Sequence, residues 1–293
     1  MITTVAPAKI NWTLEVLGRR EDGYHEVRTV LQAIDLHDEL SFETSDGQGI
    51  SIGGSGIPDD EDLIAMAARR FCEAYETGGT IHVKKSVPIS AGLGGGSSDA
   101  AATLRLLNAA NGSPWDDEEL SAMAAELGSD VPFFLHGGTA LAEGRGERVT
   151  PLPLPDVAPT WLVVVVPPIA VPNKSALMYS LLEAADLSDG STTGAFRHYV
   201  VNGGAPDPAM LINAFERAAE KMFPDLVKYR QWMIEAGTSS VHLSGAGPAL
   251  FALTSGEAEA RAIRARMNRP KMGERVYVVR TLTAAASTLT WDS

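Results

Sequence analysis

Residues 88–98, which read PISAGLGGGSS, have the composition of a loop that binds phosphate. Four glycines occupy five positions, namely Gly92, Gly94, Gly95 and Gly96. Glycine reaches positive φ freely and has no Cβ, so consecutive N–H groups can converge on one bound anion. An Ala/Leu-rich helix is predicted over 98–110, and its first turn would add unpaired N–H groups and the positive end of the helix dipole. The alternative, a flexible glycine linker, rarely lies between a strand and a helix.

The spacing separates this glycine loop (residues 88–98) from two other nucleotide motifs. A Walker A loop places lysine directly after its last glycine, where this chain has Ser97. The Rossmann fingerprint needs G-x-G-x-x-G on a tighter turn. Ser97 and Ser98 can cap the helix or offer hydroxyls to phosphate or to a cation. The residues expected to bind nucleotide phosphates are Pro88, Ile89, Ser90, Ala91, Gly92, Leu93, Gly94, Gly95, Gly96, Ser97 and Ser98.

The composition limits the partners of the protein. The chain has 293 residues and a net charge of −13, which argues against a broad binding surface for nucleic acid. The longest apolar run, residues 161–166, is too short to cross a bilayer, and no signal-peptide pattern opens the chain. Cys72 stands alone, so no intrachain disulfide can form. We expect a cytoplasmic protein whose partner is a small molecule, with no nucleic acid and no membrane.

Strand-like and helix-like segments alternate along the chain, which predicts an α/β (α+β) fold with two sheets. A proline-rich stretch, residues 151–159, is the expected domain boundary and divides the chain into 1–155 and 156–293. Strands are expected at 10–17, 39–45, 80–87, 161–166, 241–243, 249–253 and 275–282. Helices are expected at 60–75, 98–110, 116–127, 175–185, 208–222, 225–236 and 257–268, with a loop between 186 and 207.

Two further side chains could take part in phosphoryl transfer. Asp130 precedes the apolar run 131–134, which could partly desolvate its carboxylate and favour proton acceptance, although such an Asp is more often a capping or loop residue. Lys9 lies at the entry to the strand expected at 10–17, where a solvated lysine is the simpler interpretation. Asn11 is two residues further on and therefore shares the strand face of Lys9.

Three segments resemble the motifs of the GHMP kinases. The glycine loop resembles the second motif, residues 6–11 (APAKIN) the first, and residues 243–248 (LSGAGP) the third. The resemblance implies an ATP-dependent small-molecule kinase that uses Mg²⁺. It also implies a ribosomal-protein-S5-like N-terminal domain and a ferredoxin-like C-terminal domain. Lys9 and Asp130 would be the catalytic pair, with Asp130 as the base for the acceptor hydroxyl and Lys9 facing the γ-phosphate.

Four other segments are similar to one branch of that family, whose acceptor is a polyol linked to cytidine diphosphate in the non-mevalonate isoprenoid pathway. They are residues 17–26 (LGRREDGYHE), 32–36 (QAIDL), 128–134 (GSDVPFF) and 213–216 (NAFE). The resemblance implies phosphorylation of the 2-hydroxyl of the polyol. It implies that Tyr24 stacks on cytosine, that His25 hydrogen-bonds the edge of the base, and that Tyr179 closes the sandwich. It also places Asn11, Gly245 and Gly247 at the substrate.

Some positions depart from the family pattern. The third motif has Ala246 and Ala249 where hydroxyl side chains are usual, and Asp62 stands where the family has an asparagine near adenine. Lys84 and Lys85 precede the glycine loop. The sequence is equally consistent with two interpretations, that they contact the nucleotide or that they are solvated lysines of a strand. Asn213 and Glu216 are expected to have structural roles rather than catalytic ones.

Two other functions stay open from the sequence. One is phosphorylation of a mevalonate- or homoserine-like alcohol, against which the Tyr24–His25 pair argues, because a small alcohol needs no base-stacking platform. The other is a non-catalytic nucleotide-binding module, against which the joint presence of Lys9 and Asp130 argues.

Overall fold

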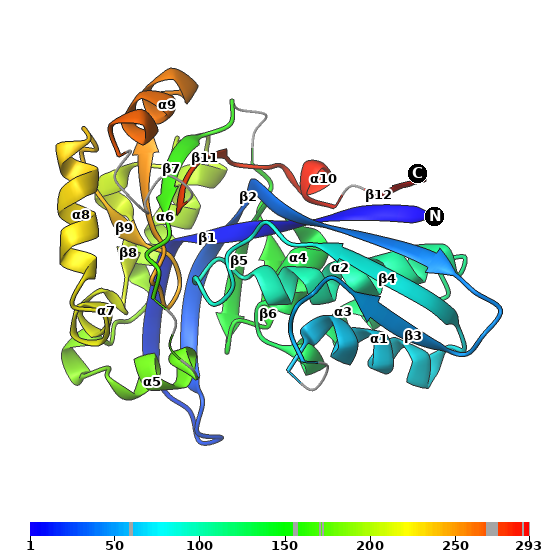
Figure 1. Cartoon of the computed structure of the whole chain (residues 1–293). Coiled ribbons are helices and arrows are strands. Elements are labelled where there is room, and N and C mark those ends of the chain that lie inside the picture. Colours follow the sequence, from blue (N-terminus) through cyan, green and yellow to red (C-terminus); the bar gives the residue numbers. More distant parts are fainter. Residues whose placement is uncertain are drawn as a thin grey trace.

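The computed structural model describes residues 1–58, 61–154, 158–169, 171, 173–267, 275–288 and 290–292. In this part of the chain the strands form two sheets, one of eight strands and one of four, and helices pack against both (Figure 1). The alternation of strands and helices in the sequence predicted this arrangement. Among the described residues, no helix is both long and apolar enough to span a membrane.

The first sheet is built on a long antiparallel hairpin. Its arms, β1 (Ile2–Arg19) and β2 (His25–Thr44), run across the width of the molecule (Figure 1). The strands expected at 10–17 and 39–45 are parts of these two longer strands. The other strands of this sheet are β3 (Gly49–Gly53), β4 (Gly78–Lys84), β5 (Thr139–Gly144), β6 (Arg148–Pro151), β8 (Ile212–Asn213) and β12 (Thr290–Asp292).

The alternation of side chains along β1 separates a polar cluster from an apolar one. Lys9 and Asn11 are joined by a hydrogen bond on one face. Ile10 and Trp12 are buried in a different cluster, together with residues of the second sheet such as Phe251. Because successive side chains of a strand point to opposite faces, β1 carries Lys9 and Asn11 on the face away from that core.

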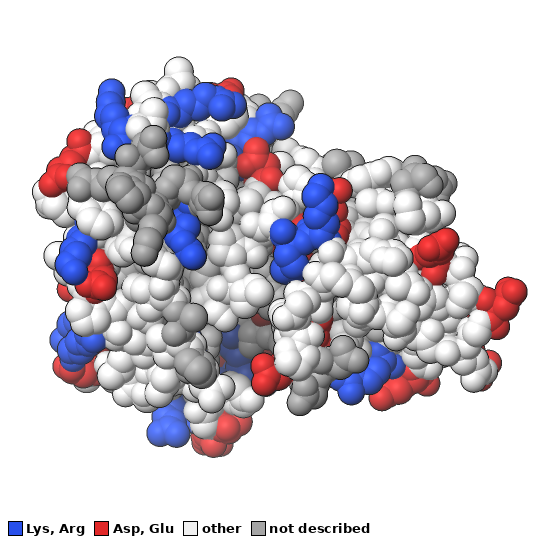
Figure 2. All heavy atoms as spheres, viewed as in Figure 1, with Lys and Arg blue, Asp and Glu red and all other residues white. Residues whose placement is uncertain are grey.

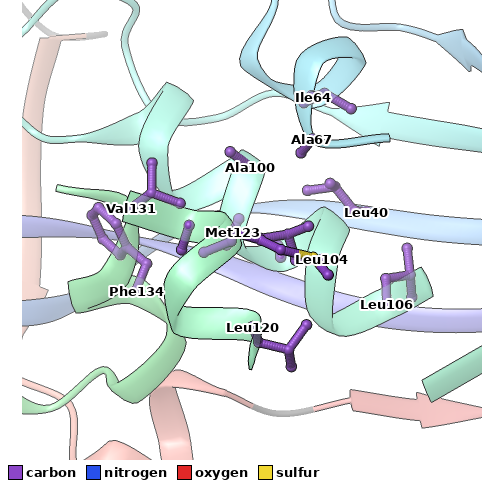
Figure 3. Close-up of a cluster of buried hydrophobic side chains, with 14 of the residues drawn as sticks. Leu40, Ile64, Ala67, Ala100, Leu104, Leu106, Leu120, Met123, Val131 and Phe134 are labelled. Carbon is purple, nitrogen blue, oxygen red and sulfur yellow. The ribbon is translucent and has the colours of Figure 1, made fainter. Parts of the chain in front are cut away.

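Helices cover the outer face of the first sheet. They are α1 (Leu63–Ala74), α2 (Gly95–Ala110), α3 (Asp117–Leu127) and α4 (Val131–His136). Their core contains Leu104 of α2, Met123 of α3 and Phe134 of α4 (Figure 3). The alanines of residues 100–102 are fully buried, because small side chains let α2 approach β1 and β2 closely. Asp116 and Glu119 form a capping box that fixes the start of α3.

The second sheet has the strand order β11–β7–β10–β9. Its strands are β7 (Trp161–Val165), β9 (His242–Leu243), β10 (Leu250–Thr254) and β11 (Val276–Arg280). The helices that pack on and around it include α7 (Glu216–Met222), α8 (Leu226–Glu235) and α9 (Glu257–Arg266). The remaining helical segments of the second half are α5 (Lys174–Ser180), η1 (Ala184–Asp186), α6 (Ser191–Val201), η2 (Pro208–Met210) and α10 (Ala284–Ser287).

The second half of the chain also returns twice to the first sheet. β8 pairs in parallel with β1 through Thr13 and Leu14. β12 pairs antiparallel with the start of β1, so both ends of the chain lie close together (Figure 1). The return through β8 brings Asn213 and the segment behind it to the strand that carries Lys9.

The predicted secondary structure is wrong in two places, and it did not include β3, the β5–β6 hairpin, β12, α4 or α10. Residues 208–222 form η2, β8 and α7 rather than one helix, because the Asn213 side chain bonds to backbone outside any helix. The expected loop between 186 and 207 contains α6, which begins after Gly190 in a left-handed conformation. The apolar run 131–134 is the first part of α4. The end of the helix expected at 257–268 lies outside the described residues.

Candidate active site

Lys9 lies at the centre of a polar cluster on β1. Only 4% of the residue is exposed, and its backbone N–H donates to the carbonyl of Leu93 in the glycine loop at 2.9 Å. Its Nζ donates to Asn11 Oδ1 at 2.8 Å and lies 3.6 Å from Asp130 Oδ2. The buried ammonium is therefore fixed between an amide and a carboxylate, directly beside the glycine loop.

Asn11 is oriented by a chain of hydrogen bonds within the hairpin. Its Nδ2 donates to Thr29 Oγ1 at 2.9 Å, and that hydroxyl donates to the carbonyl of Thr13. The amide oxygen of Asn11 must then face Lys9, because the amide nitrogen is used toward Thr29. The prediction that Lys9 and Asn11 share a strand face is confirmed.

Asp130 occupies the N-cap position of α4. Its side chain is 39% exposed and makes no capping hydrogen bond within the described structure. The apolar run behind it, Val131 with Phe133 and Phe134, is buried in the helical core rather than wrapped around the carboxylate. The carboxylate thus faces both solvent and Lys9, where an acceptor molecule can reach it.

The glycine loop is held by its carbonyl groups. Four consecutive carbonyls accept hydrogen bonds from three separate parts of the fold, namely α5, the segment 244–249 and β1. Ser90 accepts from Lys174 Nζ, Ala91 from the Ala249 N–H, Gly92 from Ser244 Oγ and Leu93 from the Lys9 N–H. Within the described residues, no backbone N–H group of residues 89–97 finds an acceptor in the protein. A loop with fixed carbonyls and free N–H groups, running into the start of α2, has the chemistry of an anion cradle.

Close approaches explain two of the loop glycines. Gly94 has φ +74°, and a Cβ there would lie 2.7 Å from the Phe134 ring and 3.1 Å from Cγ of Lys9. Gly92 has φ +87°, and its Cβ would lie 2.9 Å from the carbonyl oxygen of Gly247. A side chain at either position would push the loop off the site.

A second glycine turn, residues 244–248, closes the site from the other half of the chain. A Cβ on Gly245 would lie 3.1 Å from Lys9 Nζ and 3.1 Å from the carbonyl oxygen of Gly92. Asn213 Nδ2 donates to the carbonyls of Leu243 and Gly245 at 3.0 and 2.9 Å, which sets the path of the turn. Glu216 accepts from the Leu243 N–H at 3.0 Å. Asn213 and Glu216 therefore support the turn, as the sequence analysis expected.

The aromatic residues of the β1–β2 loop lie on another side of the cluster. The rings of His25 and Tyr179 stack with centroids 4.7 Å apart and 14° between their planes. Burial, together with the charge of Asp130, raises the pKa of Tyr179, which places the phenol within electrostatic reach of that carboxylate. Tyr24 is 54% exposed, and its ring faces the guanidinium of Arg145 at 4.8 Å.

Arg145 was not singled out by the sequence. It lies in the turn between β5 and β6, a hairpin that the sequence did not predict. The next residue, Gly146, is close enough to Asp130 that a Cβ would lie 3.9 Å from Oδ1. One short turn thus connects the Tyr24 ring to the Asp130 carboxylate, and only the fold brings them together.

The two lysines before the glycine loop have different environments. Lys84 is exposed and pairs with Glu39. Lys85 is largely buried and bonds to Asp38 and Asp99, two carboxylates from β2 and from the first turns of α2. Asp38 also accepts from the N–H groups of residues 86 and 87, so this cluster anchors the start of the loop.

Burial raises the pKa of Asp99 to about 8, against the opposing effect of Lys85. Asp62, which stands where the family has asparagine, caps α1 through the Ile64 N–H. Its Oδ2 is buried with no partner among the described residues. The shared feature of both aspartates is a buried carboxylate at a helix start beside the glycine loop.

The recess between the two halves of the molecule has basic atoms at its floor, while the rest of the face shown carries mixed charges (Figure 2). A protein of net charge −13 thus offers an anion a local binding place rather than a broad basic surface. Among the described residues, no group of three or more His, Cys, Asp or Glu side chains could hold a metal ion.

Known proteins match nearly the whole chain. Residues 62–138 match the family model of the GHMP kinases N terminal domain, and residues 202–271 match that of the GHMP kinases C terminal domain. The 4-diphosphocytidyl-2-C-methyl-D-erythritol kinase of Dehalococcoides mccartyi is 41% identical over 285 residues, which cover 96% of this chain and 99% of the relative. The kinase of the same name from Pelotomaculum thermopropionicum is 41% identical over 288 residues, covering 96% and 98%.

Solved structures agree with this relationship. A crystal structure of 4-(cytidine 5'-diphospho)-2C-methyl-D-erythritol kinase superposes with a TM-score of 0.80 at 36% identity, covering 95% of this chain and 98% of the other. A homoserine kinase from Cytophaga hutchinsonii superposes with a TM-score of 0.75 at 19% identity, covering 99% and 97%, which shows a shared fold alone. The predicted two-domain GHMP kinase fold is confirmed. The chain is an ATP-dependent small-molecule kinase and belongs, among the GHMP kinases, to the family of 4-diphosphocytidyl-2-C-methyl-D-erythritol kinases.

Proposed function

We propose that this chain transfers the γ-phosphoryl group of ATP to the 2-hydroxyl of 4-diphosphocytidyl-2-C-methyl-D-erythritol, a step in the non-mevalonate route to isoprenoid precursors. The cluster of Lys9, Asn11 and Asp130 beside the glycine loop carries the proposal. The identity of 41% over 285 residues to a kinase named for this substrate supports the choice of acceptor.

The transfer needs a proton acceptor, and Asp130 is placed for it. Its exposed carboxylate takes the proton of the 2-hydroxyl as the oxygen attacks the γ-phosphorus. The bond from that phosphorus to the bridging oxygen breaks, and ADP leaves with the electron pair. The ammonium of Lys9 lies beside the carboxylate and offsets the charge that develops on the transferring group. Asn11 holds Lys9 and offers hydrogen bonds near the reacting hydroxyl.

The phosphates of ATP bind the free N–H groups of residues 89–97 and the start of α2. The contact residues are those predicted from the sequence, from Pro88 through Ser98. The glycine turn, with Gly245 and Gly247, lies against the same loop and faces the diphosphate of the acceptor. Both glycine segments thus bind negatively charged phosphates through backbone N–H groups, without the need for a charged side chain.

Cytosine binds at the β1–β2 loop. Tyr24 offers an exposed ring for stacking, His25 offers backbone and ring groups for the edge of the base, and Tyr179 lies beside them on α5. Stacking on one aromatic ring is worth about 1–3 kcal/mol per base. A homoserine- or mevalonate-like alcohol would leave these rings unused.

Mg²⁺ enters with ATP, because magnesium keeps several waters and takes most of its other ligands from phosphate oxygens. The residues fit such an ion, since no protein cage is needed for it. The hydroxyl of Ser98 on the first turn of α2 is buried with no partner among the described residues, which makes it the candidate protein ligand. When bound, the ion neutralises phosphate charge.

We also propose two domains, residues 1–155 and 156–293, and a cytoplasmic location. The proline-rich stretch between β6 and β7 supports the boundary.

Incubation with Mg-ATP and the cytidyl substrate, followed by mass spectrometry, tests the proposed reaction. We expect a product heavier by one phosphoryl group, with one ADP formed for each product. Parallel incubations with mevalonate and with homoserine are the controls. Turnover of either control alcohol without turnover of the cytidyl substrate would overturn the proposal, and ATP binding without any product would favour a non-catalytic module.

A further inference from the structure

Lys174, the first residue of α5, is a buried lysine to which the sequence analysis gave no role. The residue is 8% exposed. Its Nζ donates to the carbonyl of Ser90 in the glycine loop at 2.6 Å and also to the carbonyl of Gly247 in the glycine turn. One ammonium group therefore ties together the two glycine-rich segments, which are about 150 residues apart in the sequence.

Residues that adopt the left-handed backbone conformation lie on both sides of this ammonium. Ser90 has φ +54° and Asn173, directly before Lys174, has φ +51°. A left-handed conformation is unfavourable for a non-glycine residue. Gly247, which has φ +68°, adopts the same region without this cost. The surrounding fold therefore holds the carbonyls that bond to Lys174 in place despite the unfavourable backbone conformation of Ser90 and Asn173.

The ammonium of Lys174 lies within electrostatic reach of the catalytic centre. Burial, together with the charge of Lys9, lowers the pKa of Lys174 to about 8. Lys9 contacts the glycine loop through Leu93 and lies beside Gly245 of the turn. Two lysines thus contact the same pair of glycine segments, Lys174 with its ammonium and Lys9 with its backbone N–H on the loop and its ammonium beside Gly245. Like charges gathered in this way favour an anion between the segments.

α5 also carries Tyr179, five residues after Lys174. The ring of Tyr179 stacks on His25 at 4.7 Å and packs edge-on against Phe215 at 4.9 Å. In Figure 1, α5 lies beside the loop that joins β1 and β2. A helix of less than two turns therefore contacts the aromatic platform with one residue and both glycine segments with another.

We propose that Lys174 is a positioning residue that couples the two halves of the site. When the cytidyl group contacts Tyr179, it holds α5 in one position. Lys174, on the same helix, then fixes the glycine loop and the glycine turn in the arrangement that binds the phosphates of ATP. The identity of the cytidyl ligand rests on the proposed function, whereas the link between the two glycine segments rests on the contacts of Lys174 alone.

Two measurements on Lys174→Met test the proposal, with Lys174→Gln as a second variant that keeps one donor group. The matched control is Lys84→Met, which removes an exposed lysine near the same loop. First, hydrogen exchange of the substrate-free protein should be faster by at least about tenfold in Lys174→Met at the hydrogen-bonded amides of the two segments, Ser98, Gly247 and Ala249, because a local opening costs less without the link. Lys84→Met should match the unmodified protein, and Lys174→Gln should lie between.

Second, calorimetry should give the affinity for a non-hydrolysable ATP analogue with and without the cytidyl substrate. In the unmodified protein we expect the substrate to tighten the analogue by about 5–150-fold, the usual size of such coupling. Lys174→Met should reduce this factor to nearly one, with little change in the affinity for either ligand alone. A large loss of affinity for the analogue alone would make Lys174 a direct phosphate ligand and overturn the coupling role.

The failure of the inference and the failure of the proposed function give different results. If the unmodified protein neither binds nor phosphorylates the cytidyl substrate, the proposed function fails, and the coupling fails with it. The exchange experiment then still decides whether Lys174 links the two segments. If the product forms but exchange and coupling are unchanged in Lys174→Met, the function stands and the inference is overturned.

Discussion

The two halves of the site are built in different ways. In the half proposed to bind phosphate (the phosphate half), four consecutive carbonyls of the glycine loop are fixed by three separate parts of the fold, and the N–H groups of residues 89–97 are left for a ligand. In the half proposed to bind cytidine, here called the cytidine half, Tyr24 is exposed while His25 stacks directly on Tyr179. The first half is therefore assembled before any ligand binds. In the second half, contacts between aromatic side chains must still be replaced by contacts with the base.

The distance between rings makes this difference concrete. A base held between two aromatic rings needs them about 7 Å apart, twice the contact distance of stacked atoms. His25 and Tyr179 are 4.7 Å apart, so no base fits between those two rings. If the base stacks on the face of Tyr179 that His25 covers, His25 must first leave its place. Backbone geometry can be fixed in advance, whereas stacking surfaces stay in contact with one another until a base replaces them.

The largest expected effect lies where the two halves meet. Asp130→Asn should lower kcat by roughly 10²–10⁴, because the acceptor hydroxyl loses its base. KM for both substrates should change far less, since the amide keeps the size of the side chain. Steady-state kinetics with product detection measures this.

Asp116→Asn is the matched control for Asp130→Asn, because Asp116 also occupies the N-cap position of a helix but lies away from the site. Asparagine caps a helix about as well as aspartate, so kcat should not change. An unchanged kcat in Asp130→Asn would remove that residue from the mechanism.

Gly92→Ala tests whether the phosphate half is fixed in advance. The new Cβ would meet the carbonyl oxygens of Ser244 and Gly247 in a backbone region that disfavours alanine. Strain and overlap together should cost roughly 2–5 kcal/mol, expressed as weaker ATP binding and a lower free energy of unfolding.

Gly194→Ala is the control for Gly92→Ala, because a Cβ on this helical glycine of α6 meets nothing within 4 Å. It should stabilise the protein by about 0.5–1 kcal/mol, as measured by urea denaturation. If Gly92→Ala bound ATP normally, the loop would be adaptable, and the contrast between the two halves would disappear.

The same contrast decides what the sequence could predict. The glycine loop was recognisable because four glycines before an Ala/Leu helix restrict the backbone locally. Lys9 and Asn11 were placed on one face by the period of a strand, which is also a local rule. The fold class followed from the alternation of elements. In each case the physical cause lies within a few residues of the signal.

Contacts between distant segments could not be predicted in this way. The carbonyls of Ser90 and Gly247 meet on Lys174 only because α5 folds back over both glycine segments. Arg145 reaches Tyr24 through an unexpected hairpin. Residues 208–222 were predicted as one helix because their pattern is helical, while pairing of β8 with β1 overrides that pattern. No local rule contains this tertiary information.

Tyr24→Ala sharpens the description of the cytidine half. Loss of one stacking surface should raise KM for the cytidyl substrate by about 5–150-fold, which corresponds to about 1–3 kcal/mol. KM for ATP should stay the same, because the phosphate half does not depend on this ring. Tyr24→Phe keeps the ring and should behave almost as the unmodified protein. Equal increases in both KM values would show that the halves are not separable at this position.

The smallest expected effect concerns the buried charges that anchor the glycine loop. Burial raises the pKa of Asp99 to about 8, well above its ordinary value near 4. Between about pH 4 and about pH 8 the folded state therefore holds a proton that the unfolded chain has already released. The free energy of unfolding should consequently fall as the pH rises from about 4 to about 8. Asp99→Asn is neutral throughout, so it should flatten this dependence and gain roughly 1–2 kcal/mol relative to the unmodified protein at pH 8. Urea denaturation at pH 5, 6.5 and 8 measures how the free energy of unfolding depends on pH, and Asp46→Asn, at an exposed position, is the control. If Asp99→Asn were less stable than the unmodified protein at pH 8, the ionised carboxylate would be needed beside Lys85. The anchor of the loop would then be a salt bridge rather than a protonated carboxyl group.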